Sequence, residues 1–155
     1  MTFLRAFLAF LLLPAVVGGL IPWLLLGGGQ SKTGAPLGWP LMLAGACVLL
    51  WCVRDFYVKG KGTLAPWDPP KRLVIVGLYR FVRNPMYVGV LSWVAGWSLV
   101  AGSRVLAVYC VLLAVAFHLR VILYEEPTLA RLFGDEWKQY RSRVNRWLPK
   151  FRSRA

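Results

Sequence analysis

The sequence predicts an all-α integral membrane protein with about four transmembrane helices. Hydrophobic residues make up 58% of the 155 positions, and only 16% are charged, whereas soluble domains usually carry about a quarter. Mean hydropathy is positive, at +0.57. Positions 6–31, 33–53 and 84–103 contain no Asp, Glu, Lys or Arg. Each of these stretches approaches or exceeds the roughly 20 apolar residues that a spanning helix needs.

The whole chain, 1–155, is expected to form a single membrane domain. We expect spans at about 4–26, 39–57, 85–102 and 104–124, a cytoplasmic loop at 58–84 and an amphipathic tail at 127–148. The first apolar run is longer than the core of a cleavable signal peptide, so we expect it to be retained and to end at Gly27-Gly28-Gly29. The charge-free stretch of the fourth span, 105–119, is shorter than the others, but apolar residues 121–124 extend it beyond Arg120.

The basic residues predict both the orientation and the partner. A net charge of +13 would suggest nucleic acid binding in a soluble protein. Here, sixteen of the nineteen basic residues lie in positions 54–83 and from 120 onward. The positive-inside rule then places both termini and these two segments in the cytoplasm, next to anionic headgroups. We therefore expect a multi-pass protein whose partner is the lipid bilayer, and no nucleic acid.

The cysteines and the single histidine do not predict a metal site. Cys47, Cys52 and Cys110 all lie inside apolar runs, and no two of them form a CxxC pair. Buried thiols that behave as small hydrophobic side chains explain this pattern.

The loop at 58–84 is too rich in proline to be one continuous helix. A loop of this length in a small protein is usually functional or disordered, and its aromatic and aliphatic content argues against disorder. Its last residues, Asn84-Pro85, predict a helix start, with Asn84 as N-cap and Pro85 in the first turn. The positive end of that helix can hold a carboxylate or phosphate, although capping alone also explains the pair.

A second polar segment follows the fourth span. Glu125 and Glu126 lie at the expected membrane edge, where ionisable groups are functional by default. The alternative is that they form structural ion pairs with Arg120 or Arg83. His118 shares a helical face with Glu125, and either a hydrogen bond to a neighbouring span or a role as ligand contact or proton acceptor would explain it.

The tail after Pro127 has an apolar residue at helical spacing, with basic residues between. These residues are Leu129, Leu132, Phe133, Trp137, Tyr140 and Val144. The pattern predicts an amphipathic helix on the membrane surface, broken at Gly134.

Two separated motifs carry a resemblance to a known family. Positions 73–89 (LVIVGLYRFVRNPMYVG) and 125–137 (EEPTLARLFGDEW) resemble the isoprenylcysteine carboxyl methyltransferase family, and phospholipid N-methyltransferases share related motifs. The resemblance covers roughly the second half of the chain. It implies an S-adenosylmethionine-dependent methyltransferase whose cofactor is enclosed by the loop and the tail at the cytoplasmic interface.

The resemblance also assigns the cofactor-binding residues. They are Lys71, Arg72, Leu73, Val74, Tyr79, Arg83, Asn84, Pro85, Met86, Tyr87 and Glu125. The residue types suit the ligand, because the aromatic faces of Tyr79 and Tyr87 attract a sulfonium cation. Arginine or the helix start at Asn84 would hold the carboxylate, and Glu125 would accept from the amino group or a ribose hydroxyl.

The methyl acceptor is expected to be hydrophobic or lipid-like, with a carboxylate, amine or thiol as nucleophile. An amine must lose a proton, and His118 or Glu126 would take it. Asn84 stands where the carboxyl methyltransferases often have histidine. Val121 stands where an arginine is associated with prenylcysteine recognition, so the adjacent Arg120 joins the candidate catalytic residues.

Two other functions compete with this interpretation. A membrane reductase of related helical architecture would use the basic loop residues to hold the extra phosphate of NADPH. A non-enzymatic membrane scaffold would use the basic segments as lipid anchors and the loop as a partner surface. The glutamate pair is harder to explain in a reductase.

Overall fold

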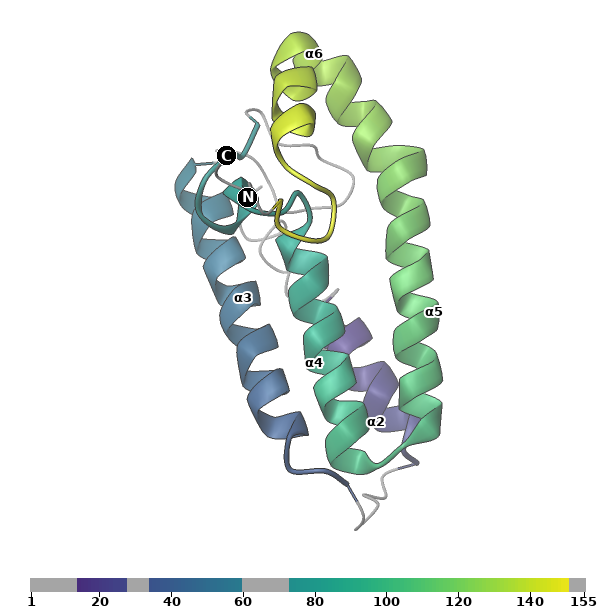
Figure 1. The fold of residues 1–155 in the computed structure, drawn as a ribbon. Helices are drawn as coiled ribbons and strands as arrows, with labels where there is room; N and C mark the ends of the chain where they lie inside the picture. Colours follow the sequence, from purple (N-terminus) through teal and green to yellow (C-terminus); the bar gives the residue numbers. More distant parts are fainter. Residues whose placement is uncertain (1–13, 28–33, 60–72, 151–155) are drawn as a thin grey trace, which may run out of the picture.

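The described part of the chain is built almost entirely from helices. The computed structural model describes residues 14–27, 34–59 and 73–150. The elements are η1 (Val16–Leu20), α2 (Ile21–Leu25), α3 (Gly38–Lys59), η2 (Gly77–Arg80), α4 (Pro85–Ala101), α5 (Arg104–Arg120), η3 (Val121–Glu125) and α6 (Glu126–Arg143). Helices α3, α4 and α5 run side by side, and α6 folds back over one end of them (Figure 1).

Two of the described helical stretches are long and apolar enough to cross a membrane. One is Gly38–Asp55, and the other lies within the continuous run Arg104–Arg143. Val16–Leu25 and Pro85–Ala101 are apolar but shorter. The spans expected at 39–57 and 85–102 match α3 and α4 to within two residues at each end. Much of the span expected at 4–26, and residues 60–72 of the expected loop, lie outside the described residues.

Helices α3 and α4 approach each other closely because glycines face each other across their contact. A Cβ atom on Gly45 would lie 2.7 Å from the carbonyl oxygen of Gly89. A Cβ on Gly96 would lie 2.6 Å from the carbonyl oxygen of Gly38. Small residues at such positions let helix backbones pack directly where lipid provides no hydrophobic driving force. This contact fixes the position at which α4 begins, and therefore one wall of the site below.

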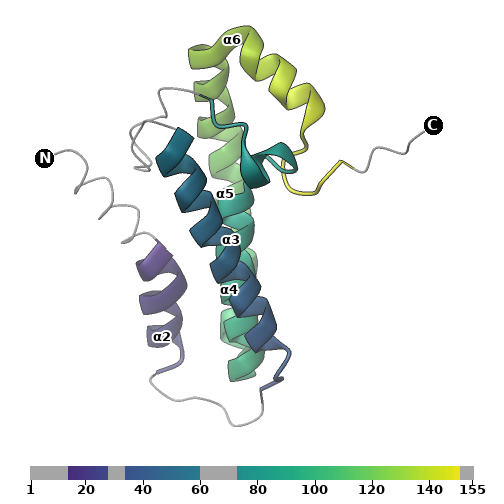
Figure 2. The same ribbon diagram turned by 90° about the vertical axis from the view of Figure 1, so that its left-hand side faces the viewer.

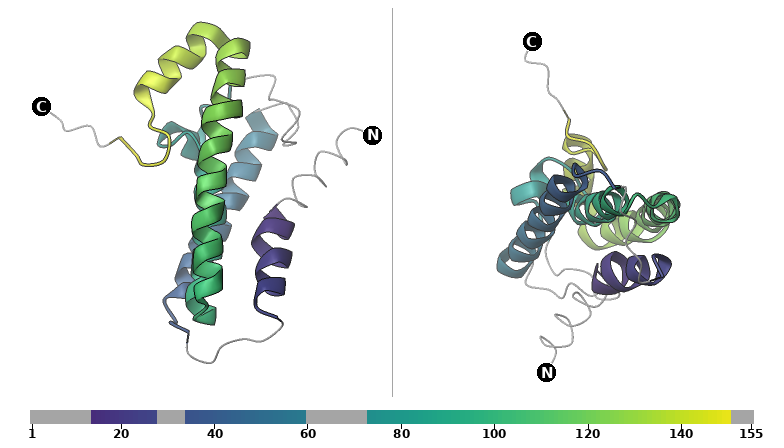
Figure 3. Two further views of the ribbon diagram at one scale, coloured as in Figure 1. Left: turned by 90° about the vertical axis from the view of Figure 1, so that its right-hand side faces the viewer. Right: turned by 90° about the horizontal axis from the view of Figure 1, so that it is seen from below.

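Side chains from α4 and α5 donate hydrogen bonds to backbone carbonyls of η1 that receive none from Pro22. Pro22 has no N–H group, so it cannot donate to the carbonyls of Gly18 or Val17, four and five residues earlier. The Trp93 indole donates to Gly18 O at 2.9 Å, and the Tyr109 hydroxyl donates to Val17 O at 2.9 Å. Seen end-on, α2 lies beside α5 and away from α3 (Figure 3). Gly27 ends this helix with a positive φ of 58°, as expected.

The tail reverses direction after α5. A π-helical turn, η3, joins α5 to α6, and Gly134 interrupts α6 with φ 47° and ψ −116°. The break predicted at Gly134 is therefore confirmed. Beyond it, the chain runs back beside the segment that precedes α4 (Figure 2). Part of the apolar face that was expected to lie on the membrane packs against the protein instead. Trp137, Tyr140 and Val144 are buried against Leu73 and Ile75.

Candidate functional site

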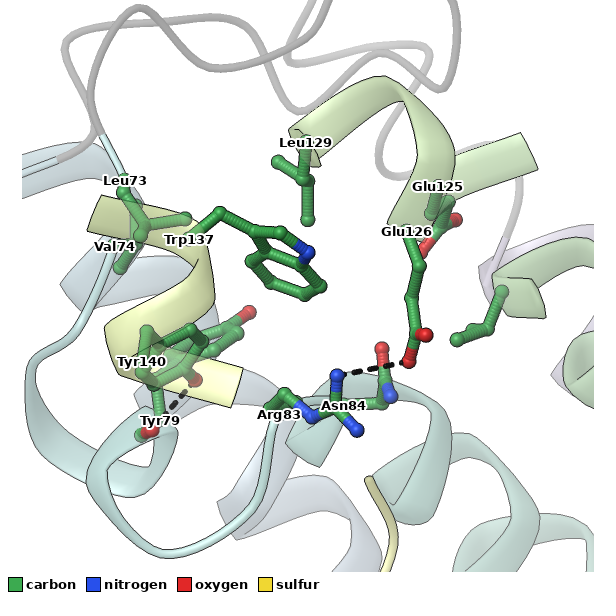
Figure 4. Close-up of a pocket in the computed structure, with 11 residues that line it drawn as sticks. Leu73, Val74, Tyr79, Arg83, Asn84, Glu125, Glu126, Leu129, Trp137 and Tyr140 are labelled. Atoms are coloured by element: carbon green, nitrogen blue, oxygen red, sulfur yellow. Dashed lines mark hydrogen bonds and ion pairs between the residues drawn. The ribbon is translucent and has the colours of Figure 1, made fainter. Parts of the chain in front are cut away.

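A pocket opens where the turned-back tail covers the segment before α4. It contains about 450 Å³ of space, including open solvent at its mouth. Three parts of the chain supply its walls: residues 73–84, the turn between α5 and α6, and α6 itself (Figure 4). The lining residues are Leu73, Val74, Tyr79, Arg83, Asn84, Val121, Glu125, Glu126, Leu129, Trp137 and Tyr140.

Glu126 is the buried carboxylate of this pocket, and two arginines surround it. Arg146 donates from Nε to Oε1 at 2.7 Å and from Nη2 to Oε2 at 2.9 Å. Arg83 Nη1 lies 3.0 Å from the same Oε1. Burial alone would raise the pKa of Glu126, but the hydrogen bonds from Arg146 and the charge of Arg83 hold it below its usual value.

Arg83 is buried without its full set of hydrogen bonds. Its side chain is 9% exposed, and burial lowers the pKa of its guanidinium. The contact with Glu126 is close, but Nε and Nη1 make no hydrogen bond of acceptable geometry. The Trp137 ring covers one side of the guanidinium, 5.4 Å from its central carbon. Because buried donors are almost always satisfied, these atoms require an acceptor other than the described side chains, such as a ligand oxygen or a water molecule. With Glu126 and Arg146 included, the group carries a net charge of +1, which suits an anion.

Glu125 lies on the other side of the turn and is also paired. Arg120 Nε donates to Glu125 Oε1 at 2.9 Å, and the Tyr87 hydroxyl donates to the same oxygen. In a π-helical turn, residues five apart lie next to each other, so η3 brings Arg120 and Glu125 together. Tyr87 is itself held by stacking on Phe117, with ring centroids 4.3 Å apart. Both glutamates therefore adopt the ion pairs that the structural alternative describes, while both also line the pocket.

His118 is held by the tail and does not line the pocket. Its Nδ1 atom accepts a hydrogen bond from the Trp147 indole at 3.1 Å. A nitrogen that accepts carries no hydrogen, so the neutral ring has its proton on Nε2. Nδ1 can take a proton from a substrate only if Trp147 moves away. The hydrogen bond that the sequence left open as an explanation for His118 is present, but Trp147 of the tail supplies it rather than a neighbouring span.

The chain just after α6 is tied to the residues before α4. Val82 and Asn145 form an isolated parallel bridge, and Arg83 N donates to Asn145 O at 2.9 Å. Asn84 Nδ2 donates to Arg146 O at 3.2 Å. Asn84 stands at the N-cap position with a proline in the first turn, but its side chain makes no capping hydrogen bond. The predicted helix start at Asn84-Pro85 is confirmed, and the Asn84 amide N–H contacts the tail.

A further hydrogen bond joins α6 to the segment at 73–84. The Tyr140 hydroxyl donates to Tyr79 O at 2.7 Å (Figure 4). Tyr79 is 8% exposed, and this burial raises the pKa of its phenol well above the ordinary value. Both phenols are therefore neutral and serve as apolar walls with a fixed hydroxyl.

The structure gathers most of the predicted site residues. Those that line the pocket are Leu73, Val74, Tyr79, Arg83, Asn84, Glu125 and Glu126. Those that do not line it are Pro85, Met86, Tyr87, His118 and Arg120. Lys71 and Arg72 lie outside the described residues. The described residues contain no group of three or more His, Cys, Asp or Glu side chains placed to hold a metal ion.

Several lining residues were not predicted as part of the site. The sequence places Leu129, Trp137 and Tyr140 on a surface helix, because Gly134 predicts a break in that helix but not the direction of the chain after it. Val121 was noted only for the arginine that it replaces. Arg146 was missed altogether, because nothing in its spacing connects it to Glu126, twenty residues earlier.

Comparisons with known proteins identify the family. Residues 35–136 match the phospholipid methyltransferase family, so the chain belongs to it. The chain is 36% identical over 77 residues to protein-S-isoprenylcysteine O-methyltransferase of Schizosaccharomyces pombe, covering 50% of this chain and 33% of that protein. It is 34% identical over 84 residues to methanethiol S-methyltransferase 1 of Bradyrhizobium diazoefficiens, covering 54% and 28%. No solved structure gives a significant match.

The resemblance predicted from the two sequence motifs is thus confirmed. The human protein-S-isoprenylcysteine O-methyltransferase is similar as well, at 32% identity over 77 residues. Each of these matches covers about a third or less of the relative's own length. The family and the apolar helices together indicate a membrane protein.

Proposed function

We propose that this member of the phospholipid methyltransferase family is an S-adenosylmethionine-dependent methyltransferase acting on a hydrophobic or lipid-like acceptor. The observation that carries the proposal is Arg83, a buried guanidinium with unsatisfied donors that lines the pocket. The names of the relatives support the reaction class, since they act on isoprenylcysteine and on methanethiol.

The residues present fit the proposed cofactor. Arg83 can hold the methionyl carboxylate with charge-assisted hydrogen bonds. Tyr79 and Trp137 present aromatic surface, which attracts a sulfonium cation. Glu125 offers an acceptor for an amino group or a ribose hydroxyl, and its ties to Arg120 and Tyr87 fix its orientation. Bound there, the cofactor would supply a methyl group that passes to the acceptor's nucleophile while the sulfur keeps the electrons of the broken C–S bond.

The chain's own contribution is alignment and exclusion of water. Leu129, Val121 and Trp137 give the pocket apolar walls. A carboxylate or thiolate acceptor needs no base. For an amine acceptor the base is not His118 in this arrangement, because Trp147 occupies Nδ1. Glu126 is also tied, and its lowered pKa makes it a weaker base than an ordinary carboxylate.

The membrane placement is part of the same proposal. Four spans would place both termini and the pocket on the cytoplasmic side. The support for this orientation is the sixteen basic residues in 54–83 and from 120 onward, because basic residues favour the cytoplasmic side of a membrane. A cysteine introduced at Lys150, in a variant lacking the three native cysteines, should react with a membrane-impermeant maleimide only after the inner face is opened. Labelling from outside intact cells would reverse the orientation.

The experiment that tests the activity follows a labelled methyl group. Purified protein in lipid nanodiscs is given labelled S-adenosylmethionine with a prenylated thioether acid, an alkyl thiol or an amine-bearing phospholipid. We expect transfer to at least one acceptor, and a loss of roughly 10- to 100-fold in Glu125→Ala. Glu136→Ala, which removes an exposed carboxylate of α6, is the matched control. Transfer that survives unchanged in Glu125→Ala would remove the assigned site.

A further inference from the structure

Three consecutive residues after α6 hold two residues that line the pocket, Arg83 and Glu126, and one that does not, His118. Asn145 accepts from the backbone of Arg83, Arg146 pairs with Glu126, and Trp147 donates to His118. We call residues 145–147 the clasp. Asn145 holds the backbone of Arg83, and Trp147 holds the ring of His118, whereas Arg146 forms an ion pair with the Glu126 carboxylate. Arg146 is therefore the clasp residue that acts on the electrostatics of the site.

The geometry around Glu126 shows how the two arginines share one carboxylate. Arg146 forks across both oxygens, at 2.7 and 2.9 Å. A bidentate arginine–carboxylate pair is the strongest arrangement available to these groups. Arg83 is left with a 3.0 Å contact to one oxygen, and its Nε and Nη1 atoms are unsatisfied. Arg146 thus holds the acceptor that Arg83 would otherwise use.

We infer that Arg146 is a positioning residue that occupies Glu126 and so keeps Arg83 available for an anionic group of the ligand. Without Arg146, both oxygens of Glu126 become open to Arg83, which is already in contact with one of them. Arg83 would then fork onto Glu126, and its donors would turn away from the pocket. The inference rests on the proposed function, because it takes the ligand to be the carboxylate-bearing cofactor.

A simple structural tie predicts something different. If the Arg146–Glu126 pair only fastened the tail to the turn between α5 and α6, removing either partner would loosen it equally. In the arrangement inferred here, the two substitutions differ. Arg146→Gln releases a competing carboxylate, whereas Glu126→Gln removes the competitor. The double substitution should then recover binding that the single Arg146→Gln change has lost.

The test is a double-mutant cycle on S-adenosylhomocysteine binding, measured by calorimetry in detergent. Arg146→Gln is expected to raise Kd by about tenfold or more, in line with loss of hydrogen bonds to a charged group. Glu126→Gln should bind at least fivefold more tightly than Arg146→Gln, and the double variant should recover most of that difference. Arg143→Gln, an exposed arginine of the same tail, is the control.

The possible results of this cycle distinguish a failure of the positioning role of Arg146 from a failure of the proposed function. Equal loss in both single variants and in the double would overturn the positioning role in favour of a structural tie. An unchanged Kd in Arg146→Gln would overturn it too. If Arg146→Gln does not keep the wild-type melting temperature, Arg146→Lys replaces it: one ammonium leaves one oxygen open, so an intermediate loss is expected and no loss contradicts the inference. Failure of the wild type to bind would overturn the proposed function, and the inference with it.

Discussion

The apolar and polar ends of this molecule are held together in different ways. Along α3 and α4, backbones touch directly through Gly38, Gly45, Gly89 and Gly96. At the polar end, segments far apart in the sequence are joined side chain by side chain. The ties there are Arg83–Glu126, Arg146–Glu126, Tyr140–Tyr79 and Trp147–His118.

The difference shows which part of the molecule sets shape and which part sets chemistry. The glycine contacts join backbone to backbone and have no side chain that could rotate, so they leave no room for an added atom and offer no group to a ligand. The polar ties use groups that can exchange partners, and one of them leaves donors unsatisfied. Substitutions in the apolar half should therefore change folding alone, whereas those at the polar end should change ligand binding as well.

The largest effect is expected where backbones touch. In Gly45→Val, the added Cβ would lie 2.7 Å from both Gly89 O and Trp93 N. Neither backbone atom can move without separating α3 from α4, so we expect a loss of about 3 kcal/mol and little folded protein. Monodisperse yield and melting temperature in detergent measure this. Gly19→Ala, where a Cβ meets nothing within 4 Å, should behave as wild type; equal damage in both would contradict the contact.

Removing one tyrosine hydroxyl at each end of the molecule allows the apolar and polar ends to be compared directly. Tyr109→Phe removes the donor to Val17 O, and Tyr140→Phe removes the donor to Tyr79 O. Each should lower the free energy of unfolding by about 1–2 kcal/mol, because a part-buried or buried carbonyl loses its partner. Only Tyr140→Phe should also weaken S-adenosylhomocysteine binding. Weaker binding in Tyr109→Phe, with Tyr140→Phe unaffected, would reverse the assignment of the two ends.

The clasp tryptophan should give a smaller effect. Trp147→Phe keeps an aromatic ring but removes the indole donor to His118, so we expect a loss of about 1 kcal/mol in stability. Ligand affinity should change less than threefold, because His118 does not line the pocket. Trp39→Phe, at an exposed position, is the control. A large loss of affinity in Trp147→Phe would return His118 to the binding site.

The smallest effect is expected from acid. The pKa of Glu126 lies below its usual value, because Arg146 and Arg83 outweigh its burial. A depressed carboxyl pKa contributes stability that is complete above the unfolded-state pKa and is lost as pH falls through the folded-state pKa. The difference in melting temperature between wild type and Glu126→Gln should therefore shrink as pH is lowered below the ordinary glutamate range. A difference that stays constant to pH 3 would mean that the charge of Glu126 does not matter.

Much of the fold was predictable because it depends on local signals. Asn84-Pro85 predicts where α4 begins, and Gly102, with φ 59°, ends it where the charge-free stretch ends. The pocket was predictable in part, since each of the two motifs contains residues that line it. The direction of the tail was not, because Gly134 signals a break and not where the chain goes next. The pairing of Arg146 with Glu126 depends on that direction, so no periodicity could indicate it.

The measurement that decides whether the pocket binds the cofactor is a calorimetric titration of the detergent-purified protein with S-adenosylhomocysteine, with NADPH as the comparison ligand. We expect saturable binding of S-adenosylhomocysteine that Glu125→Ala weakens, and no binding of NADPH. Binding of NADPH alone would favour a reductase. Binding of neither ligand by a folded sample would contradict the proposed methyltransferase and favour a scaffold.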